Sequence, residues 1–425
     1  MLTSKEIIEK KKEYFFPNAM HFYKNPPHII RGEGKYLFDD KGKRYLDFFA
    51  GVTVVNCGHC NKFINDRIKA QIDNLQHTSV IYLTEPMVVL AEMLSKVLPG
   101  GINKTFFCNS GTEANEGAML LARLYTGKKG FISFEGGLHG RSALTMSVTG
   151  IPMWRIDPFL DSDVYIAKGF MKSYEDGKEI ESSDGASKKS LEKVEEILKL
   201  HGSEIAACIV EPIQGNGGIN VPAPDFFIKL KELLQKYDVL LIADEVQTAF
   251  GRTGKMFAVE HFGIVPDIIT YAKALGNGQP IGAFSAGQKI AEAFNKPSAS
   301  TLGGNPVSMT AGIAVLEFIE RENLCQKSEA LGEYFISKLK ILQEKNLNIL
   351  DVRGLGLMIG VEMKSAELVD EILEAMKDRG FIIGKNGMDR NVLAFQPSLI
   401  ISKEDIDLLV ANLGEVLIPF TDFSL

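Results

Sequence analysis

The sequence predicts an α/β fold with a mostly parallel central sheet and a second, smaller domain. Four short apolar runs end in polar residues or glycine: 104–111, 129–137, 205–215 and 239–246. Helical patterns separate most of these runs, which is typical of βαβ units whose strands are buried on both faces. After about residue 320 the pattern changes to a helix at 324–345 and a strand pair at 349–363, which indicates the second domain.

The composition predicts a soluble protein of ordinary type. The 425 residues are 45% hydrophobic and 24% charged, as in an average globular chain. The net charge of −7 and the scattered basic residues argue against nucleic-acid binding. No uncharged apolar run approaches the ~20 residues that span a membrane. The five cysteines, an odd number, favour a reducing compartment, so we expect a cytoplasmic protein.

The segments outside the sheet can also be assigned. Residues 31–51 indicate a β-hairpin, because two apolar stretches flank an Asp-Asp-Lys-Gly turn. Residues 62–76 and 86–98 have helical periodicity. The polar stretch 173–190 is expected to be an exposed loop.

The residues that end the apolar runs are the candidates for function. In parallel α/β sheets, ligands bind beyond the carboxyl ends of the strands. We therefore expect one cleft to contain the polar residues at these ends: Ser110, Gly111, Thr112, His139, Glu211, Asp244 and Glu245.

The stretch "CNSGTEANEGAMLLARL" (108–124) indicates a strand end, a turn and a helix start. The amide N–H groups and hydroxyls at this helix start could hold a phosphate. A simple N-terminal cap with favourably placed acids is an equally good interpretation.

The stretch "LLIADEVQTAFGRTG" (240–254) ends a buried strand with acidic residues. A carboxylate in that place needs a cationic or hydrogen-bonding partner. Asp244 could hold a protonated ring nitrogen, with Gln247 on a ring hydroxyl; a helix cap or surface ion pair is the alternative. No nearby histidine completes a metal site, and we expect none.

Lys273 lies between small apolar residues and a glycine-rich turn in "ITYAKALGNGQPIGA" (269–283). Alone it could be a surface lysine or an amine held in a closed pocket. A phosphate-binding turn, an acid suited to a protonated pyridine and an enclosed lysine are together the three groups that pyridoxal phosphate requires.

Seven motifs in order carry a resemblance over nearly the whole chain. They are "RGEGKYLFDDKGKRYLDFFAG", "NSGTEANE", "EPIQGNGG", "ADEVQTAFGRTG", "AKALGNGQPIGA", "TLGGNP" and "DVRGLGLMIGVEM". The chain resembles the class III pyridoxal-phosphate-dependent aminotransferases of fold type I, in the branch with alanine–glyoxylate and ω-amino acid transaminases. The resemblance implies a large cofactor-binding domain at 71–320 and a small α/β domain built from both termini, 1–70 and 321–425.

The resemblance also implies roles for individual residues toward the cofactor. Lys273 would form the Schiff base and shuttle the proton. Ser110, Gly111 and Thr112 would bind the phosphate. The pyridine ring would be held by the remaining residues of the set: Asp244 at its nitrogen, Gln247 at its oxygen, Val246 and Leu138 on its faces, and His139 and Glu211 beside it.

Other implied roles concern the substrate and the partner subunit. Thr301 would reach the phosphate of a neighbouring subunit, which implies a homodimer or a tetramer of such dimers. Arg353 would bind the substrate carboxylate. Tyr82 would face the substrate pocket, or pack in the core or the dimer interface.

Two positions in this set depart from the family pattern. Leu138 stands where an aromatic residue usually stacks on the ring. Asn216 stands where the 4-aminobutyrate and ornithine transaminases have a glutamate that pairs with the carboxylate-binding arginine. We therefore expect Arg353 to stay available in both half-reactions.

The resemblance implies the transfer of an amino group from an ω- or β-amino compound, or an amino acid, to a 2-oxo acid. The acceptor would be an acid such as pyruvate, glyoxylate or 2-oxoglutarate, and the reaction would pass through a pyridoxamine phosphate intermediate. An amino-acid racemase, epimerase or aminomutase on the same fold is the alternative. A third hypothesis is a catalytically silent or redox-active binding protein, for which "CGHC" (57–60) is the only signal.

Overall fold

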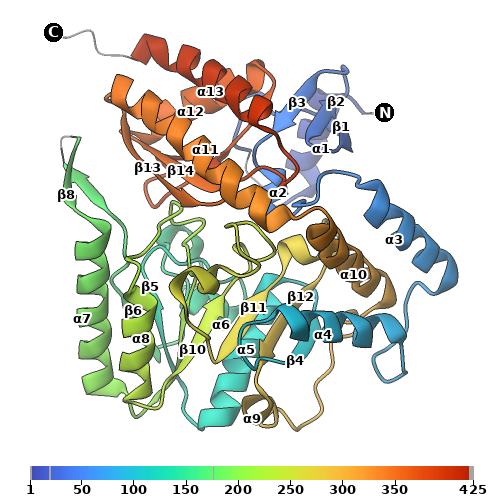
Figure 1. The fold of residues 1–425 in the computed structure, drawn as a ribbon, viewed down its shortest axis with the longest axis vertical. Coiled ribbons are helices and arrows are strands. Elements are labelled where there is room, and N and C mark those ends of the chain that lie inside the picture. The colour runs from blue at the N-terminus through green and yellow to red at the C-terminus, as the bar shows by residue number, and fades with distance from the viewer. Residues whose placement is uncertain (1, 19–20, 176, 421–425) are drawn as a thin grey trace.

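The computed structural model describes residues 2–18, 21–175 and 177–420, and a seven-stranded sheet forms its centre (Figure 1). The strand order is β4-β12-β11-β10-β9-β5-β6. Only β12 runs antiparallel to its neighbours, so the prediction of a mostly parallel sheet is confirmed. The bounds are β4 (Lys104–Cys108), β5 (Gly130–Phe134), β6 (Val164–Ala167), β9 (Ile205–Val210), β10 (Leu240–Asp244), β11 (Ile268–Tyr271) and β12 (Gly282–Ala286).

Helices pack on both faces of this sheet. From Ala207 onward, successive residues of the fully buried strand β9 alternate between two apolar clusters, because side chains along a strand point to opposite faces. Ala207 and Ile209 meet α5 on one face, whereas Cys208 and Val210 meet the side of α8. The helices around the sheet are α4 (Glu85–Val97), α5 (Gly111–Thr126), α6 (Ala143–Ser147), α7 (Ser183–His201), α8 (Phe226–Gln235), α9 (Gln288–Ala291) and α10 (Pro306–Arg321).

Two smaller sheets lie above the central one in Figure 1. One has the order β1-β2-β3-β15 and the other β13-β14-β17-β16. Strand β15 pairs in parallel with β3, with Phe381 opposite Leu46, so segments from both ends of the chain share one sheet. The bounds are β1 (Ile29–Glu33), β2 (Tyr36–Asp39), β3 (Arg44–Asp47), β13 (Ile349–Leu355), β14 (Met358–Met363), β15 (Phe381–Ile382), β16 (Gly384–Asn386) and β17 (Val392–Phe395).

The remaining α-helices are α1 (Ser4–Tyr14), α2 (Ala50–Thr53), α3 (Lys62–Asn74), α11 (Leu324–Lys345), α12 (Ala366–Asp378) and α13 (Lys403–Leu417). Helix α3 packs against α10, and α11 packs on β13 and α13. The helices expected at 62–76, 86–98 and 324–345 correspond to α3, α4 and α11. Within the described residues, no helix has the length and apolar character needed to cross a bilayer.

The expectation of a loop at 173–190 is wrong, although residues 175, 177–180, 182 and 184 are exposed as expected. This stretch forms the hairpin of β7 (Ser173–Glu175) and β8 (Lys178–Glu181), followed by the first two turns of α7. Ser182 caps the helix by accepting a hydrogen bond from the Gly185 amide. Ser190 is buried and donates to the Lys168 carbonyl. Small residues that fit against the sheet, rather than large apolar ones, form this buried helix face, so the polar composition concealed it.

Candidate active site

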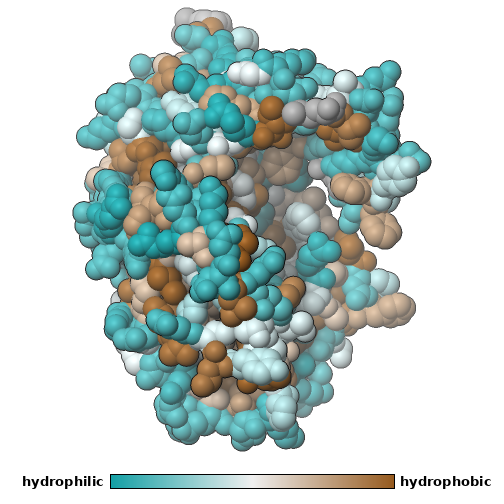
Figure 2. Space-filling view, turned by 90° about the vertical axis from the view of Figure 1, so that its right-hand side faces the viewer, coloured by the Kyte–Doolittle hydropathy of each residue, from teal (hydrophilic) through white to brown (hydrophobic). Residues whose placement is uncertain are grey.

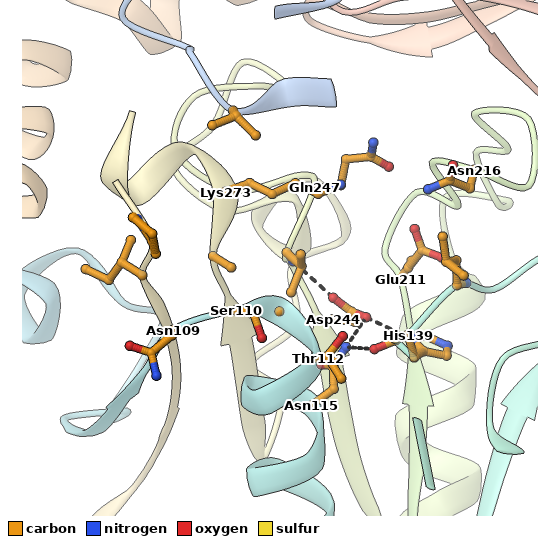
Figure 3. A pocket seen from close by; sticks show the side chains of 18 of the residues that line it. Asn109, Ser110, Thr112, Asn115, His139, Glu211, Asn216, Asp244, Gln247 and Lys273 are labelled. Carbon is orange, nitrogen blue, oxygen red and sulfur yellow. Dashed lines mark hydrogen bonds and ion pairs between the residues drawn. The ribbon is translucent and has the colours of Figure 1, made fainter. Parts of the chain in front are cut away.

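A cavity of about 380 Å³ lies at the carboxyl ends of the central strands. Figure 3 shows polar side chains from several elements pointing into it. The structure brings together most of the residues that the sequence singled out: Ser110, Gly111, Thr112, Leu138, His139, Glu211, Asn216, Asp244, Val246, Gln247 and Lys273.

One wall of the cavity is the start of α5. Ser110 caps this helix, and its hydroxyl accepts a hydrogen bond from the Glu113 amide at 3.2 Å. The amides of Gly111 and Thr112 belong to the first turn, where N–H groups have no partner within the helix. Gly111 also allows close packing, because a Cβ there would lie 2.6 Å from Cγ1 of Val246. The wall thus presents free N–H groups and the positive end of a helix dipole.

Lys273 opens a short 3-10 turn that follows β11, and its backbone is strained. Its φ of 38° lies in the left-handed region, which costs a non-glycine residue about 1–2 kcal/mol. Burial of the side chain, supported by the nearby charge of Arg252, lowers the pKa of Lys273 to about 8, against the opposing effect of Glu211 and Asp244. A substantial fraction of the amine is therefore neutral near physiological pH, as a nucleophile or base requires.

Asp244 ends β10 and is held by three hydrogen bonds. Its Oδ2 accepts from Nδ2 of Asn115 at 2.7 Å and from Nδ1 of His139 at 2.8 Å, and its Oδ1 accepts from the Val246 amide at 3.0 Å. The carboxylate is 2% exposed. A buried anion at the cavity floor is suited to hold a cationic ring nitrogen.

Glu211 joins two loops of the cavity wall. One carboxylate oxygen accepts from the Leu138 amide at 2.8 Å and the other from the Gly215 amide at 2.9 Å. Burial and the nearby Asp244 raise the pKa of Glu211 to about 7. This carboxyl group can therefore change its protonation state close to neutral pH.

Two buried polar groups in the cavity lack partners among the described residues. They are both amide atoms of Gln247 and Nε2 of His139. Gln247 lies tightly against Gly215, where any side chain would overlap its amide. Buried polar atoms normally have hydrogen-bond partners, so these two groups mark places where a bound molecule would complete the site.

Glu245 does not join the cluster, contrary to the expectation from the strand end. It is fully buried on the opposite side of the strand end, where it accepts hydrogen bonds from Thr248 and from the amides of Ala258 and Val259. The reason is the alternation along an extended chain, which points neighbouring side chains in opposite directions. Glu245 therefore caps the short helical turn at 258–262.

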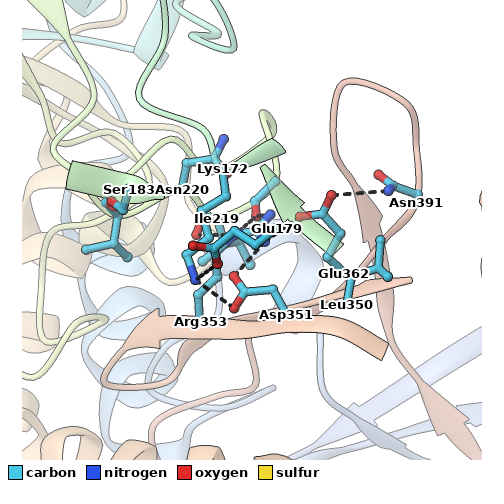
Figure 4. A network of polar contacts seen from close by, with 12 residues as sticks. Lys172, Glu179, Ser183, Ile219, Asn220, Leu350, Asp351, Arg353, Glu362 and Asn391 are labelled. Carbon is cyan, nitrogen blue, oxygen red and sulfur yellow. Dashed lines mark hydrogen bonds and ion pairs between the residues drawn. The ribbon is translucent and has the colours of Figure 1, made fainter. Parts of the chain in front are cut away.

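Arg353 does not line the cavity. Figure 4 shows its guanidinium in a network of polar contacts. It pairs with Asp351 at 3.0 Å and Glu362 at 2.5 Å and donates to the carbonyls of Gly218 and Ile219. Burial lowers the pKa of Arg353, but the two carboxylates outweigh this effect and raise it. Two acids of its own chain thus compensate the charge of Arg353, and its binding of a substrate carboxylate stays a prediction.

Tyr82 and Thr301 are also outside the residues that line the cavity. Tyr82 is 62% exposed and has exposed apolar neighbours, Ile81 and Leu83. Thr301 is exposed too. The next residue before it, Ser300, accepts a hydrogen bond from Nδ2 of Asn109, a cavity residue. In this single chain both residues lie at the surface, where a second subunit could contact them.

Several residues of the cavity wall were not expected from the sequence: Val54, Asn109, Asn115, Gly140, Ala272, Gly278, Gln279, Pro280 and Ile281. Neither was Arg141, which directly follows the cavity residue Gly140. Arg141 is exposed, and it is the only arginine in the described part of the chain with no ion pair, hydrogen bond or ring contact. A cation next to two motif residues, in "GGLHGR", was the signal that could have identified it.

Comparison with known proteins gives one consistent result. The family model described as aminotransferase class-III matches residues 21–417. The chain is 40% identical to the mitochondrial alanine–glyoxylate aminotransferase 2 homolog 2 of Arabidopsis thaliana, over 95% of this chain and 85% of that protein. It is also 40% identical to the acetylornithine aminotransferase of Archaeoglobus fulgidus, over 94% of this chain and 97% of that protein.

A solved structure extends the likeness to the fold. The ornithine aminotransferase of Toxoplasma gondii, with pyridoxal phosphate at partial occupancy in its active site, superposes with a TM-score of 0.86 at 26% identity. The superposition covers 98% of this chain and 95% of that one.

Proposed function

The chain belongs to the class-III aminotransferases, and from that premise we propose that the cavity around Lys273 is its active site. The protein is a pyridoxal-phosphate-dependent enzyme that transfers an amino group from an amino compound to a 2-oxo acid. The site assignment rests on one observation: Lys273, whose pKa is lowered, and the buried Asp244 line the same cavity.

The residues of the cavity fit the cofactor. The free amides of Gly111 and Thr112 suit the phosphate, and Asp244 suits a protonated ring nitrogen. The unpartnered amide of Gln247 can donate to the ring oxygen. Val246 and Leu138 supply apolar surface for the ring faces. When bound, pyridoxal phosphate supplies an electron sink and carries the amino group between the two half-reactions.

The chain's own contribution to catalysis is proton transfer and orientation. Lys273 Nζ accepts the proton that the donor carbon loses and returns a proton to the acceptor carbon, so that the protons balance over the full cycle. Its pKa of about 8 suits both directions of transfer. Asp244, held by Asn115 and His139, keeps its negative charge directed at one point of the cavity floor.

We assign the substrate carboxylate to Arg141 in place of Arg353. Arg353 is engaged by Asp351 and Glu362, whereas Arg141 is exposed beside Gly140 of the cavity wall. A guanidinium without a carboxylate partner can bind an incoming carboxylate through two hydrogen bonds. The loop that Arg353 holds carries Asn216, so Arg353 shapes the cavity without touching the substrate.

The donor is an ω- or β-amino compound and the acceptor is pyruvate, glyoxylate or 2-oxoglutarate. The relatives support this choice: one is named for alanine and glyoxylate, and others are named for acetylornithine, whose transferable amine is terminal. The neutral side chain of Asn216 places no charge at the cavity wall against an uncharged part of the donor.

The working unit is a homodimer in which Thr301 reaches the phosphate bound by the other subunit. Apolar side chains are exposed near the two segments concerned: Ile81, Leu83 and Leu302 are each more than half exposed. Figure 2 shows apolar residues exposed around a hollow on one side of the molecule. Exposed apolar side chains that gather in one region mark a protein interface more often than isolated ones do. A second copy would bury it together with Tyr82.

We also propose a cytoplasmic location, which cell fractionation can test. All five cysteines are free, as expected in a reducing compartment.

The test of the function is an absorbance titration of the purified protein loaded with pyridoxal phosphate. A suitable amine should convert the visible cofactor band to a near-ultraviolet one, and a 2-oxo acid should restore it. Lys273→Ala should bind cofactor without this cycle. Exchange of an α-proton with no band conversion would contradict the proposal and favour the isomerase alternative.

A further inference from the structure

Asn115 lies in the second turn of α5 and is 1% exposed. We propose that Asn115 is a positioning residue that fixes the Asp244 carboxylate in the orientation needed to hold the cofactor ring, and that Thr270 in turn fixes Asn115. The inference rests on the proposed function, because it concerns the same ring-binding carboxylate.

Every polar atom of the Asn115 side chain has a partner. Its Nδ2 donates to the His139 carbonyl and to Oδ2 of Asp244, each at 2.7 Å. Its Oδ1 accepts from the Thr270 hydroxyl at 2.6 Å. A flipped amide would place its oxygen against two acceptors and its NH₂ against a donor, so only one orientation satisfies all three contacts.

This single orientation determines how Asp244 can be used. Oδ2 of Asp244 is occupied by two donors, Asn115 and His139. Oδ1 has only the Val246 amide, at 3.0 Å. Figure 3 shows this arrangement, with Asn115 and His139 both joined to Asp244 by dashed lines. The two oxygens therefore differ, and Oδ1 retains capacity to accept from a ring N–H in the cavity.

Asn115 is suited to this task because it donates without carrying a charge. A lysine here would neutralise Asp244, and an aspartate would repel it. An amide hydrogen bond to an ionised carboxylate stabilises the charged form by more than a neutral pair does. The helix α5 packs against the sheet through Ala118 and Met119, and this packing fixes the place of Asn115 in the fold.

The test compares Asn115→Ala and Thr270→Val with the matched variant Thr270→Ser, which keeps the hydroxyl. Cofactor-free proteins are loaded with pyridoxal phosphate, and two quantities are measured: the dissociation constant and the pH midpoint of the bound cofactor's absorbance transition. Thermal unfolding of the cofactor-free proteins separates these effects from loss of fold.

We expect Asn115→Ala to raise the dissociation constant about tenfold, as loss of one hydrogen bond to a charged group implies, and to shift the pH midpoint by roughly half a unit or more. Thr270→Val should change both quantities in the same direction by less, and Thr270→Ser should restore wild-type values. If Asn115→Ala does not fold, the comparison of Thr270→Val with Thr270→Ser tests the inference.

Wild-type values in Asn115→Ala, or equal values in Thr270→Val and Thr270→Ser, would overturn the inference while leaving the proposed function intact. A wild-type protein that binds no pyridoxal phosphate would overturn both. Thus a failure of the positioning role and a failure of the function give different results.

Discussion

Arg353 and Glu362 pair diagonally across the β13–β14 hairpin, with Nη1 of the arginine 2.5 Å from Oε2 of the glutamate. The same guanidinium donates to the Gly218 carbonyl at 2.6 Å. Arg353 therefore fastens the hairpin to the loop that carries Asn216, and its replacement should affect stability before it affects substrate binding.

Arg353→Met is expected to lower the free energy of unfolding by about 1–3 kcal/mol, because it leaves the partly buried Glu362 without its ion-pair partner, while Asp351 keeps its ion pair with Lys172. Urea unfolding of the cofactor-free protein measures this. Arg141→Ala is the matched variant: its unfolding free energy should change by less than about 0.5 kcal/mol, but its KM for the 2-oxo acid should rise about 10- to 100-fold. A rise in KM for Arg353→Met at unchanged stability would reverse the assignment.

Lys273 should capture pyridoxal phosphate with a pH dependence set by its lowered pKa. Because the neutral amine reacts, the second-order rate constant for cofactor binding to the cofactor-free protein should rise with pH, with a midpoint of about 8. An ordinary lysine would give a midpoint above about 10. Stopped-flow absorbance measures the rate, and Lys273→Ala, which lacks the amine, gives the background.

Glu211 should make the cofactor-free protein less stable as the pH rises. Its pKa of about 7 in the folded state exceeds the ordinary value of 4.5, so the folded state binds more protons between these values and stability falls across that window. The loss should be roughly 2–3 kcal/mol. Glu211→Gln should lack it, when unfolding free energies at pH 5 and pH 8 are compared. An identical slope in both proteins would assign the effect to other groups.

Subunits defective at different residues should complement each other if Thr301 acts across a dimer. Mixed Lys273→Ala and Thr301→Ala subunits that exchange at random form mixed dimers in about half of the population, and each mixed dimer has one intact site. The mixture should therefore recover about a quarter of wild-type activity. Activity no greater than the average of the two variants alone would contradict a shared site.

The reactive residues at the strand ends could be predicted from the sequence, whereas the residues that hold them in place could not. Asp244, Glu211 and Ser110 each follow an apolar run, and parallel strands bring such positions to one edge. Asn115 had no comparable signal, since a polar residue within a helix that starts with acids looks like part of a solvated face. Its burial follows from the packing of α5 against β11 and β12, which no local pattern contains.

Arg353 shows the reverse case, in which the sequence indicated a residue but not its surroundings. A motif indicated an arginine, but the motif could not show that Asp351 and Glu362 compensate its charge. That depends on hairpin geometry and on a loop more than 100 residues earlier. For a similar reason Val54 was missed: it reaches the cavity only because the N-terminal segment folds back over the sheet. The division into 1–70, 71–320 and 321–425 stays a proposal.

The pairing of β3 with β15 has a consequence for the protein during its synthesis on the ribosome. Leu46 leaves the ribosome long before Phe381, its partner in the sheet, is synthesised. At about 5–20 residues per second, the N-terminal strands wait roughly 17 to 70 seconds with an open edge. Unpaired strand edges promote aggregation. Stalled nascent chains that end before residue 381 should thus be cleaved readily by protease between residues 29 and 47, and chains released at full length should resist.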